Sequence, residues 1–151
     1  PAGPTGLDRL RRLVEHAERQ EVTIALENLR RSEHLNRAFE TISSDRLGFC
    51  YDSGHENHYT KDWDLLDRYG HRLAALHLHD NKGGLDQHLP PGEGTIRWPW
   101  LMERIARTGY RGPVSLELSN IASSRLRKMS AETFLASAHS KAIALRTMMV
   151  P

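Results

Sequence analysis

The sequence predicts an α/β fold in which helices alternate with parallel strands. Three observations predict it. Short apolar runs alternate with amphipathic stretches of helical period along the 151 residues. Tight turns precede the apolar runs, whereas longer polar loops follow most of them. Each apolar run also meets a carboxylate or an imidazole at its carboxyl end. Short connections between alternating elements favour parallel strands joined by right-handed crossovers.

The first unit is a helix followed by a strand. A helix is predicted over residues 6–19, because its apolar residues share one face: Leu7, Leu10, Val14 and Ala17. Thr5 and Asp8 have the spacing of a capping box at its start. The apolar run over residues 22–28 predicts a strand that ends at Glu27.

The second unit has the same order. Apolar residues of helical spacing predict a short helix over residues 35–42. The strand over residues 47–52 follows and ends at Asp52. We expect a loop rich in histidine and asparagine after it, and then a helix over residues 63–69.

The remaining elements complete four such units. A third strand is predicted over residues 73–79, followed by a long loop rich in glycine, proline and histidine. A helix begins at Trp98, and a Gly-Pro pair precedes the fourth strand, residues 114–118. Ser130 is a suitable N-cap for the last helix.

Four strands are half of an eight-stranded barrel, which typically needs about 250 residues. An open sheet of the flavodoxin kind would place a ligand at the same strand ends, but no glycine-rich phosphate loop follows any strand here. We therefore expect residues 1–151 to be the C-terminal portion of one (β/α)8 TIM barrel domain, supplying about its last four β/α units. Because no initiator methionine is present, residues are expected to precede Pro1. Two open sheet edges require the other half of the barrel or a second copy of the chain.

Composition indicates a globular cytoplasmic protein. The formal net charge is +2, and acidic and basic residues are interspersed, which disfavours a strong nucleic-acid surface. No apolar stretch is long enough to cross a bilayer, and the N-terminus does not have the pattern of a secretory signal. The single cysteine, Cys50, lies within a predicted strand and cannot form an internal disulfide.

Four side chains at the strand ends form a candidate metal site. Carboxyl ends of parallel strands share one rim, so Glu27, Asp52, His77 and Glu117 are expected to converge. A mixed carboxylate and imidazole set suits a divalent cation such as Mn²⁺, Mg²⁺, Co²⁺ or Zn²⁺.

A second group lies close to these residues in the sequence. His55 follows Asp52 by three residues and could bind a second cation or contact a substrate. Asp86 and His88 alternate around one residue, so an extended segment points both to the same side. Two residues at the end of the third strand are expected to have supporting roles: His79 faces inward, and Asp80 orients a ligand histidine.

Five ordered motifs carry a resemblance to a known family. They are A-L-E-N at residues 25–28, Y-D-S-G-H at 51–55, L-H-L-H-D-N at 76–81, D-Q-H-L-P-P-G-E-G-T-I at 86–96 and V-S-L-E-L at 114–118. Together they resemble the xylose-isomerase-like TIM-barrel superfamily over nearly all of the chain. That superfamily contains sugar and sugar phosphate isomerases and epimerases, inosose dehydratases, and apurinic/apyrimidinic endonucleases of the endonuclease IV type.

The isomerase members imply one divalent cation on Glu27, Asp52, His77 and Glu117. The two glutamates would then shuttle a proton on opposite faces of a sugar, sugar phosphate or polyol, and His55 would contact its oxygens. The implied reaction is deprotonation next to a carbonyl, formation of a metal-stabilised enediolate, and reprotonation.

Two other readings stay open. The endonuclease members imply three zinc ions, with these ligands in this half of the barrel: Glu27, Asp52, His55, His77, Asp86, His88 and Glu117. Against this, the chain lacks a clear basic or aromatic-wedge loop for a flipped-out abasic site in DNA. The third reading is a non-catalytic barrel fragment that binds or assembles, because half a barrel does not close a pocket.

Overall fold

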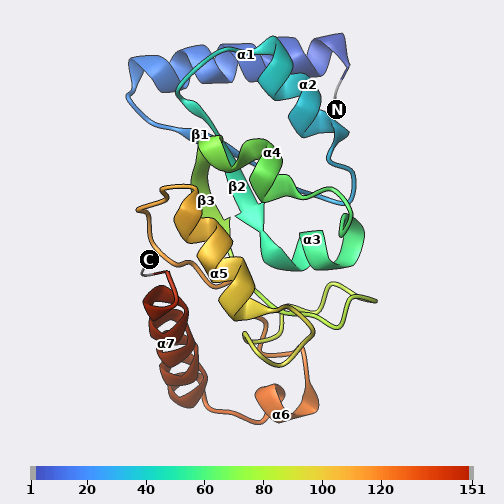
Figure 1. Ribbon diagram of the computed structural model, residues 1–151, viewed down its shortest axis with the longest axis vertical. Helices are drawn as coiled ribbons and strands as arrows, with labels where there is room; N and C mark the ends of the chain where they lie inside the picture. The colour runs from blue at the N-terminus through green and yellow to red at the C-terminus, as the bar shows by residue number, and fades with distance from the viewer. Residues whose placement is uncertain (1–2, 150–151) are drawn as a thin grey trace.

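The computed structural model describes residues 3–149 and has an α/β fold with a parallel sheet (Figure 1). The strands are β1 (Ile24–Glu27), β2 (Leu47–Asp52) and β3 (Leu73–His77), hydrogen-bonded in the order β1-β2-β3. Both pairs are parallel. This confirms the predicted fold class and the alternation of helices with strands.

The register brings the carboxyl ends of the strands to one rim. Glu27 lies opposite Cys50, and Asp52 lies opposite His77. All six residues of β2 are buried, as expected for the central strand. The strands run away from α1 (Pro4–Arg19) and toward α3 (Ser53–Tyr59) and the long loop that follows β3 (Figure 1).

The predicted fourth strand is reduced to one bridge. Residues 114–118 run parallel to the chain after β3, but they pair only through Leu116 and Leu78. The Leu78 N–H donates to the Ser115 carbonyl over 2.9 Å, and the Glu117 N–H donates to Leu78 over 3.1 Å. Within residues 3–149 this bridge is the only regular strand pairing of the segment, so it is not a strand of the sheet. The bridge still holds Glu117 at the rim.

The third strand is also shorter than predicted. Regular pairing ends at His77, because the chain beyond it changes neighbours. Leu78 pairs with Leu116, and Asp80 pairs with Leu89 of the following loop in an antiparallel bridge. The long loop is thereby folded back against the end of β3.

Two helix starts test the predicted caps. The helix α1 begins at Pro4 with Gly3 as its N-cap and no side-chain capping bond, so the capping box predicted at Thr5 and Asp8 is wrong. Proline is well suited to the first helical position, where its missing N–H loses no bond. At the other end of the chain, the Ser130 side chain accepts from the Thr133 N–H and starts α7 (Ala131–Thr147), which confirms the predicted cap.

The other predicted helices are present, and two short helices were not predicted. The former are α2 (Glu33–Thr41), α4 (Leu65–Tyr69) and α5 (Trp98–Arg107). The latter are α6 (Ser124–Arg127) and α3, which replaces the predicted loop after β2. Asp52 caps α3, since its carboxylate accepts from the His55 N–H over 2.7 Å.

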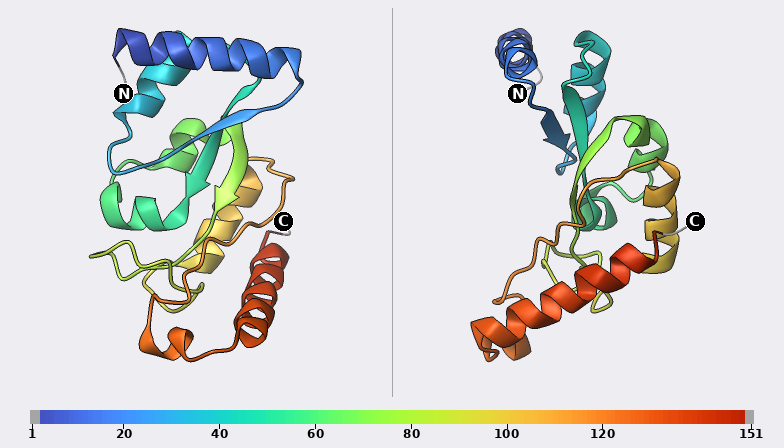
Figure 2. Two further views of the ribbon diagram at one scale, coloured as in Figure 1. Left: turned by 180° about the vertical axis from the view of Figure 1, so that it is seen from behind. Right: turned by 90° about the vertical axis from the view of Figure 1, so that its left-hand side faces the viewer.

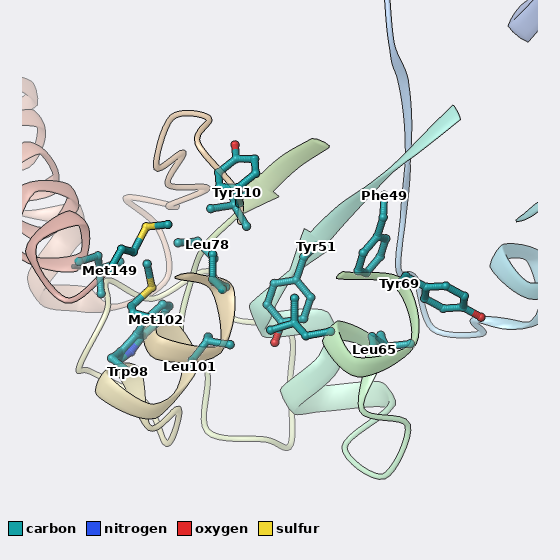
Figure 3. Packing of buried hydrophobic residues seen from close by; sticks show 14 of the residues in the cluster. Phe49, Tyr51, Leu65, Tyr69, Leu78, Trp98, Leu101, Met102, Tyr110 and Met149 are labelled. Atoms are coloured by element: carbon teal, nitrogen blue, oxygen red, sulfur yellow. The ribbon is translucent and has the colours of Figure 1, made fainter. Parts of the chain in front are cut away.

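The main hydrophobic core lies between β2, β3 and the helices α4, α5 and α7. Figure 3 shows aromatic and aliphatic side chains filling this layer, among them Phe49, Tyr51, Leu78 and Met102. Figure 2 shows α4 and α5 along one side of β2 and β3. A smaller cluster around Val14 attaches α1 to the start of the sheet. Among residues 3–149 no helix combines the length and apolar character that crossing a membrane requires.

Candidate metal centre

The four predicted ligands meet at the rim of the sheet. Glu27, Asp52 and His77 are the last residues of β1, β2 and β3, and Glu117 is placed beside them by the bridge to Leu78. One ligand atom from each of the four lies within 4.8 Å of the others. The structure thus brings together all four side chains, although they are spread over 91 positions of the sequence (117 − 27 + 1).

The donor set fits a divalent cation. His77 Nδ1 lies 3.2 Å from Glu27 Oε1 and 3.3 Å from Glu117 Oε2. Asp52 is fully buried, and its Oδ2 atom has no hydrogen-bond partner in the described part of the chain. Three carboxylates around one imidazole leave an excess of negative charge, and a buried carboxylate without a partner is unfavourable. A hard or borderline divalent cation would offset the negative charge and give the unpartnered oxygen of Asp52 a partner.

Asn28 is a positioning residue of this rim that the sequence reasoning missed. It is fully buried, and its amide donates to the Asp52 carbonyl over 2.9 Å. In return, the Asp52 N–H donates to Asn28 Oδ1 over 2.8 Å. These two bonds join the end of β1 to the end of β2. Its place directly after Glu27 in the A-L-E-N motif was the available signal.

His55 lies beside the four-ligand cluster, in the first turn of α3. Its Nδ1 lies 2.8 Å from the Asn28 carbonyl and 3.5 Å from Glu27 Oε1, and its Nε2 lies 3.2 Å from Asp86 Oδ2. A carbonyl only accepts, so Nδ1 carries a proton. A neutral ring would then turn a lone pair from Nε2 toward the Asp86 carboxylate. A cation bound by both groups would satisfy this contact.

The other residues of the predicted second group, Asp86 and His88, lie next to the ring of His79. His88 Nε2 lies 3.5 Å from Asp86 Oδ1, and the ring of His88 stacks on that of His79 with centroids 3.9 Å apart. His79 is fully buried, and its Nε2 lies 3.1 Å from Asp52 Oδ1. Two further three-residue groups have metal-ligand spacing: Asp52, His55 and His79, and His79, His88 and Glu117.

Charge interactions outweigh burial at the Asp52–His79 pair. Burial acts to raise the pKa of Asp52, but the contacts with His79 and His55 bring it below its usual value. Burial acts to lower the pKa of His79, but Asp52 and Asp86 raise it above its usual value. The pair therefore favours a carboxylate facing an imidazolium.

Asp80 has a different role from the predicted one. Instead of orienting a ligand histidine, its buried carboxylate accepts from the backbone N–H groups of Asn81 and Ile96 at 2.9 and 3.2 Å. It also accepts from the Gly92 N–H and the Trp98 indole, both at 2.9 Å. All of its acceptor capacity is used by the loop, so none is left for a histidine. Asp80 holds the loop that carries Asp86 and His88.

Sequence comparisons place these features among known proteins. The family described as "Xylose isomerase-like TIM barrel" matches residues 5–137. A protein of Sinorhizobium fredii with no assigned activity is 39% identical over 116 residues, which are 68% of this chain and 35% of that protein. The L-ribulose-5-phosphate 3-epimerase of Escherichia coli is 27% identical over 124 residues, 74% of this chain and 41% of the enzyme. The chain spans less than half the length of these curated relatives.

Solved structures show the same fold. A D-tagatose 3-epimerase-like protein aligns with a TM-score of 0.65 at 27% identity, over 89% of this chain and 55% of that structure. The IolI protein with a bound zinc atom aligns with a TM-score of 0.79 at 22% identity, over 95% of this chain and 56% of that structure.

Proposed function

The chain belongs to the xylose isomerase-like TIM barrel family, and on that premise we propose that it carries the metal centre of a sugar isomerase or epimerase. The reaction moves a proton at a carbon next to a carbonyl of a sugar, sugar phosphate or polyol. The observation that carries this proposal is the convergence of Glu27, Asp52, His77 and Glu117, whose ligand atoms lie within 4.8 Å of one another.

Each group has a distinct task in this reaction. Glu27, Asp52, His77 and Glu117 would hold a divalent cation, and the cation would supply Lewis acidity toward a substrate carbonyl. Glu27 and Glu117 contact His77 Nδ1 at 3.2 and 3.3 Å, so they flank the same point of the rim. One glutamate removes the proton and the other returns it. Return to the opposite face of the same carbon inverts its configuration, whereas return to the neighbouring carbon isomerises the sugar. His55, 3.5 Å from Glu27, holds a substrate oxygen beside the base.

Relatives of known name support the substrate class. The Escherichia coli relative is an L-ribulose-5-phosphate 3-epimerase, and one structural neighbour is a D-tagatose 3-epimerase-like protein. Both names denote proton transfer at a carbon of a sugar backbone. The zinc atom in the IolI structure, which shares this fold, supports a divalent cation at the rim.

Solvent exchange tests the proposal directly. The purified protein is loaded with Mn²⁺, Mg²⁺, Co²⁺ or Zn²⁺ and incubated with ketoses and ketose phosphates in D₂O, and deuterium incorporation is followed by NMR. We expect incorporation next to the carbonyl, reduced at least 100-fold in Glu27→Gln and Glu117→Gln. Glu33→Gln, on an exposed residue outside the site, is the matched control. Cation binding without exchange on any sugar would contradict the proposal and favour the non-catalytic alternative.

One observation favours a second candidate, a zinc-dependent phosphodiesterase acting on abasic DNA. His55 and His88 lie 3.2 and 3.5 Å from the Asp86 carboxylate, as a second ligand set would require. Elemental analysis separates the candidates, because the isomerase needs one cation on the four strand-end ligands and the phosphodiesterase needs three. Cleavage of an oligonucleotide with one abasic site, lost in His88→Ala, would establish the second candidate.

A further inference from the structure

The His79 side chain is an unusual buried group of the described residues. It is fully buried, yet neither ring nitrogen has a hydrogen-bond partner among residues 3–149. Unpartnered buried polar atoms are rare in proteins and cost roughly 1–3 kcal/mol each. A polar neighbour close to a ring nitrogen would lower this cost. That neighbour is Asp52 Oδ1, 3.1 Å from His79 Nε2.

The surroundings of His79 hold its ring at this place. The Ser53 hydroxyl accepts from the His79 N–H over 3.0 Å and donates to the His79 carbonyl over 2.7 Å. Gly54 leaves the space that the ring occupies, because a Cβ atom there would lie 1.9 Å from His79 Cε1. The ring of His88 stacks on that of His79, tilted by only 8°. Ser53 thus fixes the backbone of His79, and Gly54 and His88 fix the position of its ring.

These contacts explain the structural role of each residue of the Asp52-Ser-Gly-His55 motif. Ser53 clamps the His79 backbone, and Gly54 admits its ring. The His55 N–H and His79 Nε2 approach the same oxygen of Asp52, Oδ1, at 2.7 and 3.1 Å. The other oxygen, Oδ2, is left without a partner, and Asp52 is a member of the strand-end ligand group.

We propose that His79 is a positioning residue that holds Asp52 through Oδ1 so that Oδ2 faces the cation. This inference rests on the proposed metal centre. Groups that orient a metal ligand from behind change cation affinity without touching the cation, and their loss typically weakens it roughly 10- to 100-fold.

Two substitutions of His79 separate positioning from packing. His79→Met fills a similar volume without a donor, whereas His79→Gln can place an amide N–H near the position of Nε2. Leu76→Met, on a buried residue of β3 three positions before His79, is the packing control. Mn²⁺ affinity and stoichiometry are measured by electron paramagnetic resonance and calorimetry, with thermal unfolding recorded for every variant.

We expect His79→Met to bind Mn²⁺ roughly 10- to 100-fold more weakly at unchanged stoichiometry. His79→Gln is expected to recover most of the affinity, and Leu76→Met to keep the affinity of the parent protein. Equal affinity of His79→Met and the parent would overturn the inference, as would loss of one of two bound cations, since His79 would then be a ligand. A parent protein that binds no Mn²⁺ would instead refute the proposed metal centre. If His79→Met does not fold, Gly54→Ala gives the same test with His79 retained, because its methyl group displaces the ring.

Discussion

The side chain of Asn28 and the backbone of Asp52 form a closed pair of hydrogen bonds, 2.9 and 2.8 Å long, at the ends of two neighbouring strands. Each bond uses one polar group of the amide and one of the peptide backbone. The pair sets the spacing between the carboxyl end of β1 and that of β2. Since Glu27 directly precedes Asn28, this spacing is also the spacing of two of the four candidate ligands.

Asn28→Ala removes both bonds and leaves a buried N–H and a buried carbonyl at Asp52 without partners. We expect the free energy of unfolding to fall by about 2–4 kcal/mol, because each unsatisfied buried group costs about 1–3 kcal/mol. Urea denaturation followed by circular dichroism measures this change. Asn120→Ala, on an exposed residue, is the control and should be nearly neutral. A loss below 0.5 kcal/mol would show that water replaces both bonds.

Asp80→Asn replaces an acceptor by a donor inside the loop. In the parent protein, Oδ2 accepts from the Gly92 N–H and the Trp98 indole. Either orientation of the amide places an NH₂ group against two donors, so we expect a loss of about 2–4 kcal/mol in unfolding free energy. Hydrogen exchange at the amide of Gly92 should accelerate more than exchange in β2. Asp45→Asn, on an exposed residue, is the control, and unchanged protection at Gly92 would contradict this role.

The strand-end ligands could be predicted because their signal is local. Glu27, Asp52 and His77 each close an apolar run, and parallel register then brings them together. The prediction of a fourth strand was wrong in extent, because an apolar run of five residues does not reveal how many backbone hydrogen bonds it makes with a neighbouring segment. Glu117 nevertheless reaches the rim, because one bridge is enough to position it.

The supporting residues could not be predicted, because their signals lie far apart in the sequence. Asn28 bonds to a residue 24 positions away, and Ser53 bonds to one 26 positions away. His79 shares the strand parity of His77, which predicts its side but not its burial against Gly54. The composition of residues 53–59, rich in histidine and asparagine, predicts a loop, whereas the capping bond to Asp52 allows the helix α3 to form there. The Oδ1 atom of Asp52 caps this helix, and Oδ2 is the oxygen that we propose for the cation.

A buried carboxyl outside the metal centre gives a pH prediction. Burial raises the pKa of Glu56 above its ordinary value, against the hydrogen bonds from Tyr51 and from the Leu65 N–H, which lower it. The folded state therefore binds this proton more tightly than the unfolded state. The resulting stabilisation is complete below the unfolded pKa of about 4.5 and is lost as pH rises through the folded pKa.

Glu56→Gln removes this titration while its amide can still accept from Leu65 and bond to Tyr51. The stability of Glu56→Gln relative to the parent protein should therefore rise between pH 4 and pH 7. Urea denaturation at pH 4, 5.5 and 7, with EDTA present to exclude cation binding, measures the difference. Glu33→Gln, on an exposed residue, serves as the control. A difference that stays constant or falls with pH would contradict the raised pKa.

The last prediction concerns an anionic group on the substrate. The Arg30 guanidinium lies 5.3 Å from the centre of the Tyr59 ring, which in turn lies 5.8 Å from the ring of His55. Within residues 3–149 Arg30 has no carboxylate partner within 4 Å, whereas its neighbour Arg31 lies 3.7 Å from Glu33. A free guanidinium held over an aromatic ring near the site is suited to bind a phosphate.

Arg30→Gln should therefore raise KM for a ketose phosphate roughly 10- to 100-fold, because a charge-assisted hydrogen bond contributes about 1.5–3 kcal/mol. The KM for the corresponding unphosphorylated ketose should stay within about twofold, since that substrate carries no charge for Arg30 to bind. Arg31→Gln is the matched control, because it removes the same charge from the next position of the same loop. Steady-state kinetics on both substrates decide the matter: an equal change for the two sugars would mean that Arg30 supports the rim and does not select a phosphate.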